Sequence, residues 1–250
     1  MKTLILALCL SYSFTALSGI TIVSDLDDTI KITNAGSARQ ATYNGIFTEK
    51  VFIGIPEFLK EARNYTERLH VVTASPPIIG KRVRATLSGN NISYDSVIYK
   101  GVTGGESKIN FKVNAIKRII ERTGDQVILI GDDVNHDPEA YEEVRKAYPE
   151  KVLAIYIHVI NGRPIADSAI KYWTSFDLAL REFVAGRMDM TGVDKVARAV
   201  LDSQKLSYII PRFAQCPSQE NAFQWQMQTI FVKEASEVTQ KLNKYCLIDG

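Results

Sequence analysis

The segment TIVSDLDDTIK, residues 21–31, places three carboxylates directly after a short apolar run. The side chains of Asp25, Asp27 and Asp28 carry charge of one sign, and burying such charges costs several kcal/mol per ion unless something compensates them. A bound cation is the simplest compensator, and its remaining ligands should then come from other parts of the chain. The segment therefore predicts a carboxylate site at the end of a buried strand.

Three further apolar segments also end in polar groups: Thr73 and Ser75, the loop YKGVTGGE at 99–106, and Asp132 with Asp133. Ligands of an open parallel sheet bind outside the carboxyl ends of its strands, so we expect the acids of the first and fourth strands to meet there. Clustered carboxylates suit Mg²⁺, which keeps several waters and also binds substrate phosphates. Phosphoryl transfer needs little beyond a positioned nucleophile, a metal and positive charge on the transferring oxygens.

The alternation of apolar patterns defines the elements that would position these groups. Runs without helical periodicity predict buried strands at 20–25, 69–75, 95–101, 126–133 and 152–160. Helical spacing, with Pro or Gly at several of the ends, predicts helices at 55–65, 76–90, 110–124 and 138–149. Strands that alternate with helices indicate an α/β, Rossmann-like three-layer fold with a central parallel sheet. From about residue 174 the chain is mostly helical, with an irregular stretch at 206–220. The expected division is a leader at 1–19, a domain at 20–164 and a helical C-terminal extension at 165–250.

The leader has the layout of a secretory signal peptide: one lysine, an apolar run and then small residues, with cleavage after Ser18 or Gly19. We therefore expect an exported protein, either periplasmic or secreted. Removal of the leader leaves two cysteines, Cys216 and Cys246. An even pair in an exported protein favours a disulfide over two free thiols.

Four motifs in order resemble those of the haloacid dehalogenase-like phosphatase superfamily. They are SDLDDT at 24–29, HVVTAS at 70–75, a lysine near the start of the helix before the fourth strand, and LIGDDVNHD at 129–137. A single DxD pair would be weak evidence, whereas the ordered set is specific. The resemblance implies the fold of that superfamily. A large cap is not expected, because the stretches between Thr29 and Leu69 and between Ser75 and Lys112 are too short to hold one.

Over roughly residues 20–160 the sequence is similar to the actin-patch-associated phosphatidate phosphatase family, whose catalytic domain is lipin-like. The similarity is carried by SDLDDTIKIT, FIGIPEF, TASP, Lys112 and IGDDVNHDPEAY. The sequence departs from the family pattern at Asp133 and Val134, where the family has Ser-Gly, and after Pro76, where an aromatic residue would be expected. These departures bear on lipid specificity more than on phosphatase chemistry.

The resemblance implies a role for each polar residue of the first two motifs. Asp25 would be the nucleophile that forms an aspartyl-phosphate, and Asp27 would act first as general acid and then as general base. Asp28 would support the site or begin a helix, and Thr29 would orient Asp25 or cap the following turn. Thr73 would hydrogen-bond a phosphoryl oxygen, with a capping hydroxyl as the simpler alternative.

The later motifs would supply a cation and metal ligands. Lys112 would neutralise charge on the nucleophile and the phosphoryl group, with Lys108 as the rival candidate. Asp132 would bind Mg²⁺ directly, and Asp137 would do so through water, although Asp133 is an alternative and a helix N-terminal role would also suit Asp137. The expected magnesium ligands are Asp25, Asp27 (through its backbone carbonyl), Asp132 and Asp137.

The other polar residues near these motifs are expected to be structural. Ser75 is the less favoured partner for a phosphoryl oxygen and could cap the turn before Pro76. His136 is expected to lie beside the acids without a role, and His70 and His158 fall within apolar strands, where most histidines are structural.

A site without a large cap is open, and open sites suit bulky or surface-held substrates. We therefore expect a Mg²⁺-dependent phosphomonoesterase that acts on phosphatidate or a related lipid phosphate. One alternative is an exported acid phosphatase or phosphotransferase for soluble esters. Another is an inactive lipid-phosphate-binding module, against which the presence of both Asp25 and Asp27 argues.

Charge and patterning bear on the partners. A formal net charge of +2, without a run of lysine and arginine, argues against nucleic acid as a partner. The segment PPIIGKRVR at 76–84 combines apolar and basic residues and could make a peripheral membrane contact, although an ordinary helix start is the simpler interpretation. The oligomeric state is left open.

Overall fold

The computed structural model of the protein describes residues 18–37, 48–101, 105–217, 226 and 229–249. Its centre is a six-stranded sheet, paired in parallel throughout, in the order β3-β2-β1-β4-β5-β6. The strands are β1 (Ile20–Ser24), β2 (Arg68–Thr73), β3 (Ser96–Tyr99), β4 (Gln126–Asp132), β5 (Val152–His158) and β6 (Ile170–Tyr172). The predicted α/β fold with a central parallel sheet is confirmed.

The sixth strand was not predicted. β6 is three residues long and pairs with β5 from Tyr156↔Ile170 to His158↔Tyr172. A run of three residues is too short to show a strand periodicity, so only the pairing with β5 defines it. The sheet therefore continues beyond residue 164, into the part of the chain that we assigned to the C-terminal extension.

The four helices expected between strands are all present. The helices of the described chain are α2 (Ile55–Ala62), α3 (Gly80–Gly89), α4 (Lys108–Thr123), α5 (Asp137–Ala147), α6 (Ser175–Val184), α7 (Met190–Asp202) and α8 (Val232–Asp249), with short 3-10 turns η1 (Pro77–Ile79) and η2 (Leu206–Tyr208). Local signals set several ends: the Ser107 side chain accepts a hydrogen bond from the backbone N–H of Asn110 at the start of α4, and Gly124 adopts a left-handed φ of 71° at its end. These ends fix where α4 presents its side chains to the sheet.

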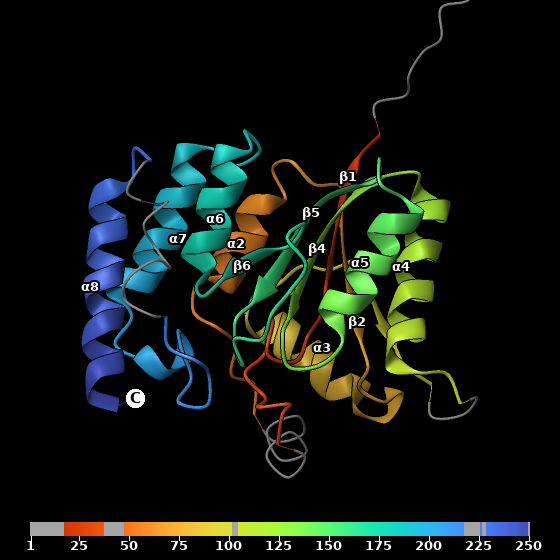
Figure 1. Ribbon diagram of the computed structural model, residues 1–250, viewed down its shortest axis with the longest axis horizontal. Coiled ribbons are helices and arrows are strands. Elements are labelled where there is room, and N and C mark those ends of the chain that lie inside the picture. Colours follow the sequence, from red (N-terminus) through yellow and green to blue (C-terminus); the bar gives the residue numbers. More distant parts are fainter. Residues whose placement is uncertain (1–17, 38–47, 102–104, 218–225, 227–228, 250) are drawn as a thin grey trace, which may run out of the picture.

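Helices α4 and α5 cover one face of the sheet, whereas α2, α6 and α7 lie on the other, with α8 beyond α7 (Figure 1). Alternate residues of a strand point to opposite faces. Val23 of β1 and Leu129 of β4 belong to the apolar core beneath α4 and α5, and Ile22 and Ile128 belong to the larger core on the other face. Burial on both faces explains why these strands read as continuous apolar runs.

The C-terminal helices share the larger core with the sheet. Phe176 of α6, Val193 of α7 and Leu242 of α8 lie in the same buried cluster as Ile22 of β1. A disulfide joins Cys216 to Cys246 of α8, with their Cα atoms 6.0 Å apart, so the expected pairing of these cysteines is confirmed. The C-terminal extension is therefore packed on the α/β core.

Two expectations fall wholly or partly on residues that the structure does not describe. The leader at 1–19 lies outside it except for Ser18 and Gly19, where the Gly19 carbonyl already accepts a hydrogen bond from the Gln126 N–H (2.9 Å). The loop at 99–106 is described only in part. In the described part of the chain, every helix is too short or too polar to cross a bilayer.

Candidate active site

The candidate site lies at the carboxyl edge of the sheet, between β1 and β4. The strand order runs outward in opposite directions from this pair, and such a switch point is where open α/β sheets bind their ligands. Asp25 directly follows β1 and Asp132 is the last residue of β4. The pairing of Ser24 with Ile130 continues in a hydrogen bond from the Asp25 N–H to the Ile130 carbonyl (2.8 Å). The sheet register thus brings together acids that are 107 positions apart in the sequence.

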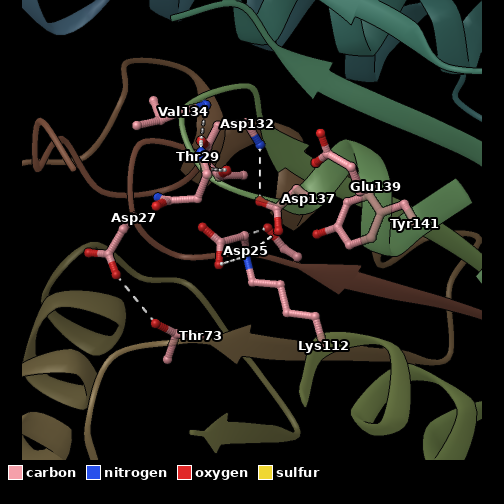
Figure 2. A network of polar contacts seen from close by, with 12 residues as sticks. Asp25, Asp27, Thr29, Thr73, Lys112, Asp132, Val134, Asp137, Glu139 and Tyr141 are labelled. Atoms are coloured by element: carbon pink, nitrogen blue, oxygen red, sulfur yellow. Dashed lines mark hydrogen bonds and ion pairs between the residues drawn. The ribbon is translucent and has the colours of Figure 1, made fainter. Parts of the chain in front are cut away.

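Lys112 reaches this edge from α4. Its Nζ donates to Asp25 Oδ1 at 2.8 Å and also to Asp137 Oδ1 (Figure 2). The lysine is 3% exposed, and Asp25 and Asp137 are also buried. Lys108 is the first residue of α4, and it is exposed. The structure therefore brings Lys112 to the acids and leaves the rival candidate Lys108 in solvent.

Asp137 occupies the first turn of α5 and points back to the end of β4. Its Oδ2 accepts a hydrogen bond from the Asp132 N–H (3.2 Å). The close approach depends on Gly131, because a Cβ at that position would lie 2.6 Å from Asp137 Oδ2. The Asp132 carboxylate is held through Oδ1, which accepts the Val134 N–H at 2.7 Å, while Oδ2 lies 3.4 Å from the Thr29 hydroxyl.

The three acids form a buried cluster of negative charge. Asp25, Asp132 and Asp137 each offer a carboxylate oxygen within 4.8 Å of the others. Lys112 forms ion pairs with two of them, Asp25 and Asp137. Its single charge leaves two negative charges uncompensated when all three acids are ionised. The set consists of oxygen donors only, which is the chemistry that Mg²⁺ prefers. The residues present therefore fit a divalent cation.

The pKa values show the same imbalance. Burial raises the pKa of Asp25 to about 7, although Lys112 opposes the shift. Burial, and then the charges of Asp137 and Asp25, raise the pKa of Asp132 well above its ordinary range. Burial alone would lower the pKa of Lys112, but Asp137 and Asp25 raise it overall, so the lysine stays charged.

Asp27 lies apart from the buried cluster, on the side of β2 (Figure 2). Its carboxylate is partly exposed and its Oδ2 accepts hydrogen bonds from the Ser75 hydroxyl (2.9 Å) and the Thr73 hydroxyl (3.3 Å). The structure thus places Thr73 and Ser75 together on Asp27, whereas the sequence suggested a separate capping role for Ser75. Because it is partly exposed, the Asp27 carboxylate can exchange protons with water or with a bound group.

Two acids of the motifs organise loops instead. Asp28 adopts a left-handed φ of 58°, and its carboxylate accepts backbone N–H groups from residues 33–35; no helix begins there, so that expected role is wrong. Asp133 accepts the backbone N–H groups of residues 160–163 at 2.6–3.2 Å. Asp137 rather than Asp133 therefore joins the acidic cluster. The Thr29 hydroxyl lies 3.4 Å from Asp132 Oδ2, whereas the resemblance implied Asp25 or the following turn as its partner.

Lys31 is the site-proximal residue that the sequence reasoning missed. It is 1% exposed and forms an isolated β-bridge with Asp27. Burial lowers the pKa of Lys31, while the charge of Asp27 raises it, so the two side chains interact electrostatically. Its position at the end of the DLDDTIK segment was the available signal. The three histidines are structural or exposed, as expected: His158 lies 2.8 Å from the Asp28 carbonyl, His70 contacts Ser96, and His136 faces solvent.

Fold and site together define a haloacid dehalogenase-like α/β protein: a parallel sheet whose switch point carries the DxD pair, a lysine and two further acids. The family described as "Phosphatidate phosphatase APP1, catalytic domain" matches residues 20–159. The chain belongs to this family, and the resemblance found in its motifs is confirmed.

Two curated relatives each match more than half of the chain. "Phosphatidate phosphatase APP1" of Saccharomyces cerevisiae is 27% identical over 155 residues, which are 58% of this chain and 26% of that protein. "Uncharacterized protein C29B5.04c" of Schizosaccharomyces pombe is 26% identical over 151 residues, 56% of this chain and 25% of that protein. The chain thus spans about a quarter of the length of the curated relatives it matches.

Among solved structures, one titled "Structure of the Pnkp1/Rnl/Hen1 RNA repair complex" matches with a TM-score of 0.40 and 16% identity. The match covers 51% of this chain and 40% of that chain. A likeness at this level carries no conclusion about function.

Proposed function

We propose that the protein is a Mg²⁺-dependent phosphomonoesterase that acts on phosphatidate or a related lipid phosphate through an aspartyl-phosphate. The observation that carries the proposal is the contact of Lys112 with both Asp25 and Asp137, in a buried acidic cluster that Asp132 completes. Family membership over residues 20–159 supports the same reaction class. The cluster provides a nucleophile, a fixed positive charge and metal ligands within one small volume.

Magnesium would be held by Asp25, by Asp132 and by the backbone carbonyl of Asp27, with Asp137 acting through water. When bound, the ion supplies positive charge to the phosphoryl oxygens and offsets the two carboxylate charges that Lys112 leaves uncompensated. Of the two Asp132 oxygens, Oδ2 is the less strongly hydrogen-bonded, because its contact with the Thr29 hydroxyl is long (3.4 Å), and it is therefore the better metal ligand. The backbone N–H donors on Oδ1 keep that carboxylate oriented.

In the first half-reaction, an Asp25 oxygen attacks the phosphorus and the ester P–O bond breaks. Asp25 Oδ1 accepts a hydrogen bond from the Lys112 ammonium, so we assign the attack on phosphorus to Oδ2. Lys112 stabilises the charge on the transferring group. Asp27 donates its proton to the leaving alkoxide oxygen, which departs as an alcohol.

In the second half-reaction, water attacks the phosphorus of the aspartyl-phosphate. Asp27, now a carboxylate, takes a proton from that water, and the bond between the Asp25 oxygen and phosphorus breaks to release inorganic phosphate. The hydroxyls of Thr73 and Ser75 hold Asp27 in place for both proton transfers. Asp25 returns to its starting state with its contact to Lys112 restored.

The test is phosphate release from phosphatidate in detergent micelles, with Mg²⁺ or with EDTA. We expect Mg²⁺-dependent release by the wild type and its loss in Asp25→Asn. Asp194→Asn is the matched control, because Asp194 is a partly exposed aspartate of α7 that is paired with Arg198. Absence of release from every lipid and soluble ester with Mg²⁺ present would refute the enzyme proposal.

A soluble aryl phosphate separates the two enzyme alternatives. Turnover of the soluble ester without turnover of lipid would keep the chemistry and discard the lipid assignment, leaving a phosphatase for soluble esters. Binding of phosphatidate without any turnover would indicate the inactive binding module.

A further inference from the structure

The chain segment that follows Ser75 forms an exposed apolar tip beside the site. Pro76, Pro77 and Ile78 are all exposed, and Ile78 is 89% exposed, the highest value among the large exposed hydrophobic residues of the described chain. A single exposed apolar residue is ordinary on a protein surface. This one is notable for its position, because the Ser75 hydroxyl two residues before Pro77 contacts the proposed acid and base, Asp27.

Three cations follow the tip directly. Lys81, Arg82 and Arg84 lie on the first turns of α3, and all three are exposed. Burial lowers the pKa of Lys31, and the positive charge of Arg82 lowers it further. Arg82 therefore lies near Lys31, which is bridged to Asp27. An exposed apolar tip and a cluster of cations thus share the rim of the site.

One other exposed apolar residue, Val184 of α6, provides a comparison. α3 lies at the carboxyl edge of the sheet, on the same side as the loops that carry the acids (Figure 1). Helix α6 begins near that edge and runs back along the sheet, so it ends towards the opposite edge of the sheet (Figure 1). Val184 is the last residue of α6, is 64% exposed and has a similar apolar character, but it belongs to the helix end that points away from the carboxyl edge. The site face thus combines an apolar tip, cations and carboxylates.

We propose that residues 76–84 seat the protein on the surface of an anionic lipid bilayer. Ile78 enters the boundary between headgroups and acyl chains, and Lys81 and Arg82 contact anionic headgroups. Apolar insertion combined with basic residues is the chemistry of peripheral binding to anionic membranes. In this position the carboxyl edge of the sheet faces the headgroups. The proposal rests on the proposed function in one respect, namely that the substrate is a lipid phosphate.

The test is co-sedimentation of the full chain with vesicles in EDTA, so that neither metal nor turnover contributes. Vesicles of phosphatidylcholine alone are compared with vesicles that also contain phosphatidylserine, and neither contains phosphatidate. We expect binding that requires phosphatidylserine and weakens with added salt. Loss of the apolar insertion in Ile78→Asp should weaken binding about tenfold or more. Each neutralised cation in Lys81→Gln/Arg82→Gln should weaken it about fivefold.

Val184→Asp is the matched control for Ile78→Asp and should bind as the wild type does. Circular dichroism confirms that each variant is folded. Wild-type protein that fails to sediment with phosphatidylserine vesicles overturns the proposal. Equal binding by Ile78→Asp and Val184→Asp also overturns it, because the site face would then have no special part.

A second readout separates this proposal from the proposed function. Phosphate release is measured from phosphatidate in vesicles and from a soluble aryl phosphate. Normal vesicle binding without any release leaves the docking proposal standing and refutes the enzyme. Equal release from vesicles by the wild type and Ile78→Asp leaves the enzyme standing and refutes docking through this segment.

Discussion

The ammonium of Lys112 lies 2.8 Å from Asp25 Oδ1, and both groups are buried beneath the carboxyl edge of the sheet. The two residues are 87 positions apart and belong to different elements, α4 and the end of β1. The contact makes Lys112 the counter-charge of the proposed nucleophile. Its removal should therefore affect stability and catalysis together.

Lys112→Met should lower the free energy of unfolding in EDTA by about 3–5 kcal/mol, because it leaves buried carboxylates without their partner. It should also lower phosphate release about 10²–10³-fold, the usual effect of removing one charge-stabilising donor. Urea unfolding and the phosphate assay measure the two effects. Lys108→Met is the control, since Lys108 is exposed four residues earlier on the same helix. Similar losses in both variants would contradict the assignment.

Asp132→Asn should stabilise the metal-free protein while weakening the site for magnesium. The substitution removes one of the mutually repelling buried charges, and the amide oxygen can still accept the N–H of Val134. We expect the free energy of unfolding in EDTA to rise on the order of 1–2 kcal/mol. The increase in melting temperature that Mg²⁺ gives the wild type should be largely lost. An unchanged response to Mg²⁺ would remove Asp132 from the ligand set.

Gly131→Ala should damage the site through a steric effect. Its Cβ would lie 2.6 Å from Asp137 Oδ2, so the carboxylate that binds Lys112 must move. We expect a destabilisation of about 1–3 kcal/mol and a clear loss of phosphate release. Gly89→Ala is the comparison, because the nearest atom to its new Cβ is 3.8 Å away. That variant should be neutral or stabilised by up to about 1 kcal/mol. Equal behaviour of the two variants would argue against the close approach.

The stability of the metal-free protein should fall as the pH rises from 5.5 to 8. The pKa of Asp25 is about 7 in the folded protein and 3.8 ordinarily, so between these values the folded state binds a proton that the unfolded state does not. Stability therefore decreases with rising pH, by on the order of 1–2 kcal/mol over this range. Burial lowers the pKa of His158 from 6.5, which acts in the opposite direction, because the unfolded state takes up the proton on acidification.

The contribution of Asp25 is isolated by comparing the pH dependence of urea unfolding in the wild type and in Asp25→Asn, both in EDTA. The variant should lack the loss of stability at higher pH and retain the opposing effect of His158. Parallel curves for the two proteins would show that Asp25 is already ionised at pH 5.5.

Reduction of the Cys216–Cys246 disulfide should lower stability without abolishing phosphate release at 25 °C. The bond closes a loop with a sequence separation of 30 residues, and loss of that constraint costs about 3–4 kcal/mol in the chain-entropy treatment. Cys216→Ser/Cys246→Ser should show the same lower melting temperature with or without dithiothreitol. A melting temperature of the wild type that does not respond to dithiothreitol would argue that the bond contributes nothing.

Much of the architecture could be predicted because the strands are buried on both faces and the helices are amphipathic. The runs at β1, β2, β4 and β5 are continuous and apolar, and the helices between them carry Pro, Ser or Gly signals at their ends. β6 escaped prediction because three residues carry no period, and only pairing with β5 makes them a strand. The extent of the sheet is therefore a tertiary property.

The sequence by itself determined the chemistry that this protein can offer: a DxD pair after one apolar run, an acid after another, and a lysine on the helix between them. Only the tertiary structure decided which lysine and which acids come together at the site. Helix α4 directs Lys112 inward and leaves Lys108 in solvent. Asp28 and Asp133 accept hydrogen bonds from backbone N–H groups of loops, whereas Asp137 lies in the site. The physical reason is that each choice depends on helix rotation and on loop hydrogen bonds, which arise only when distant segments pack together.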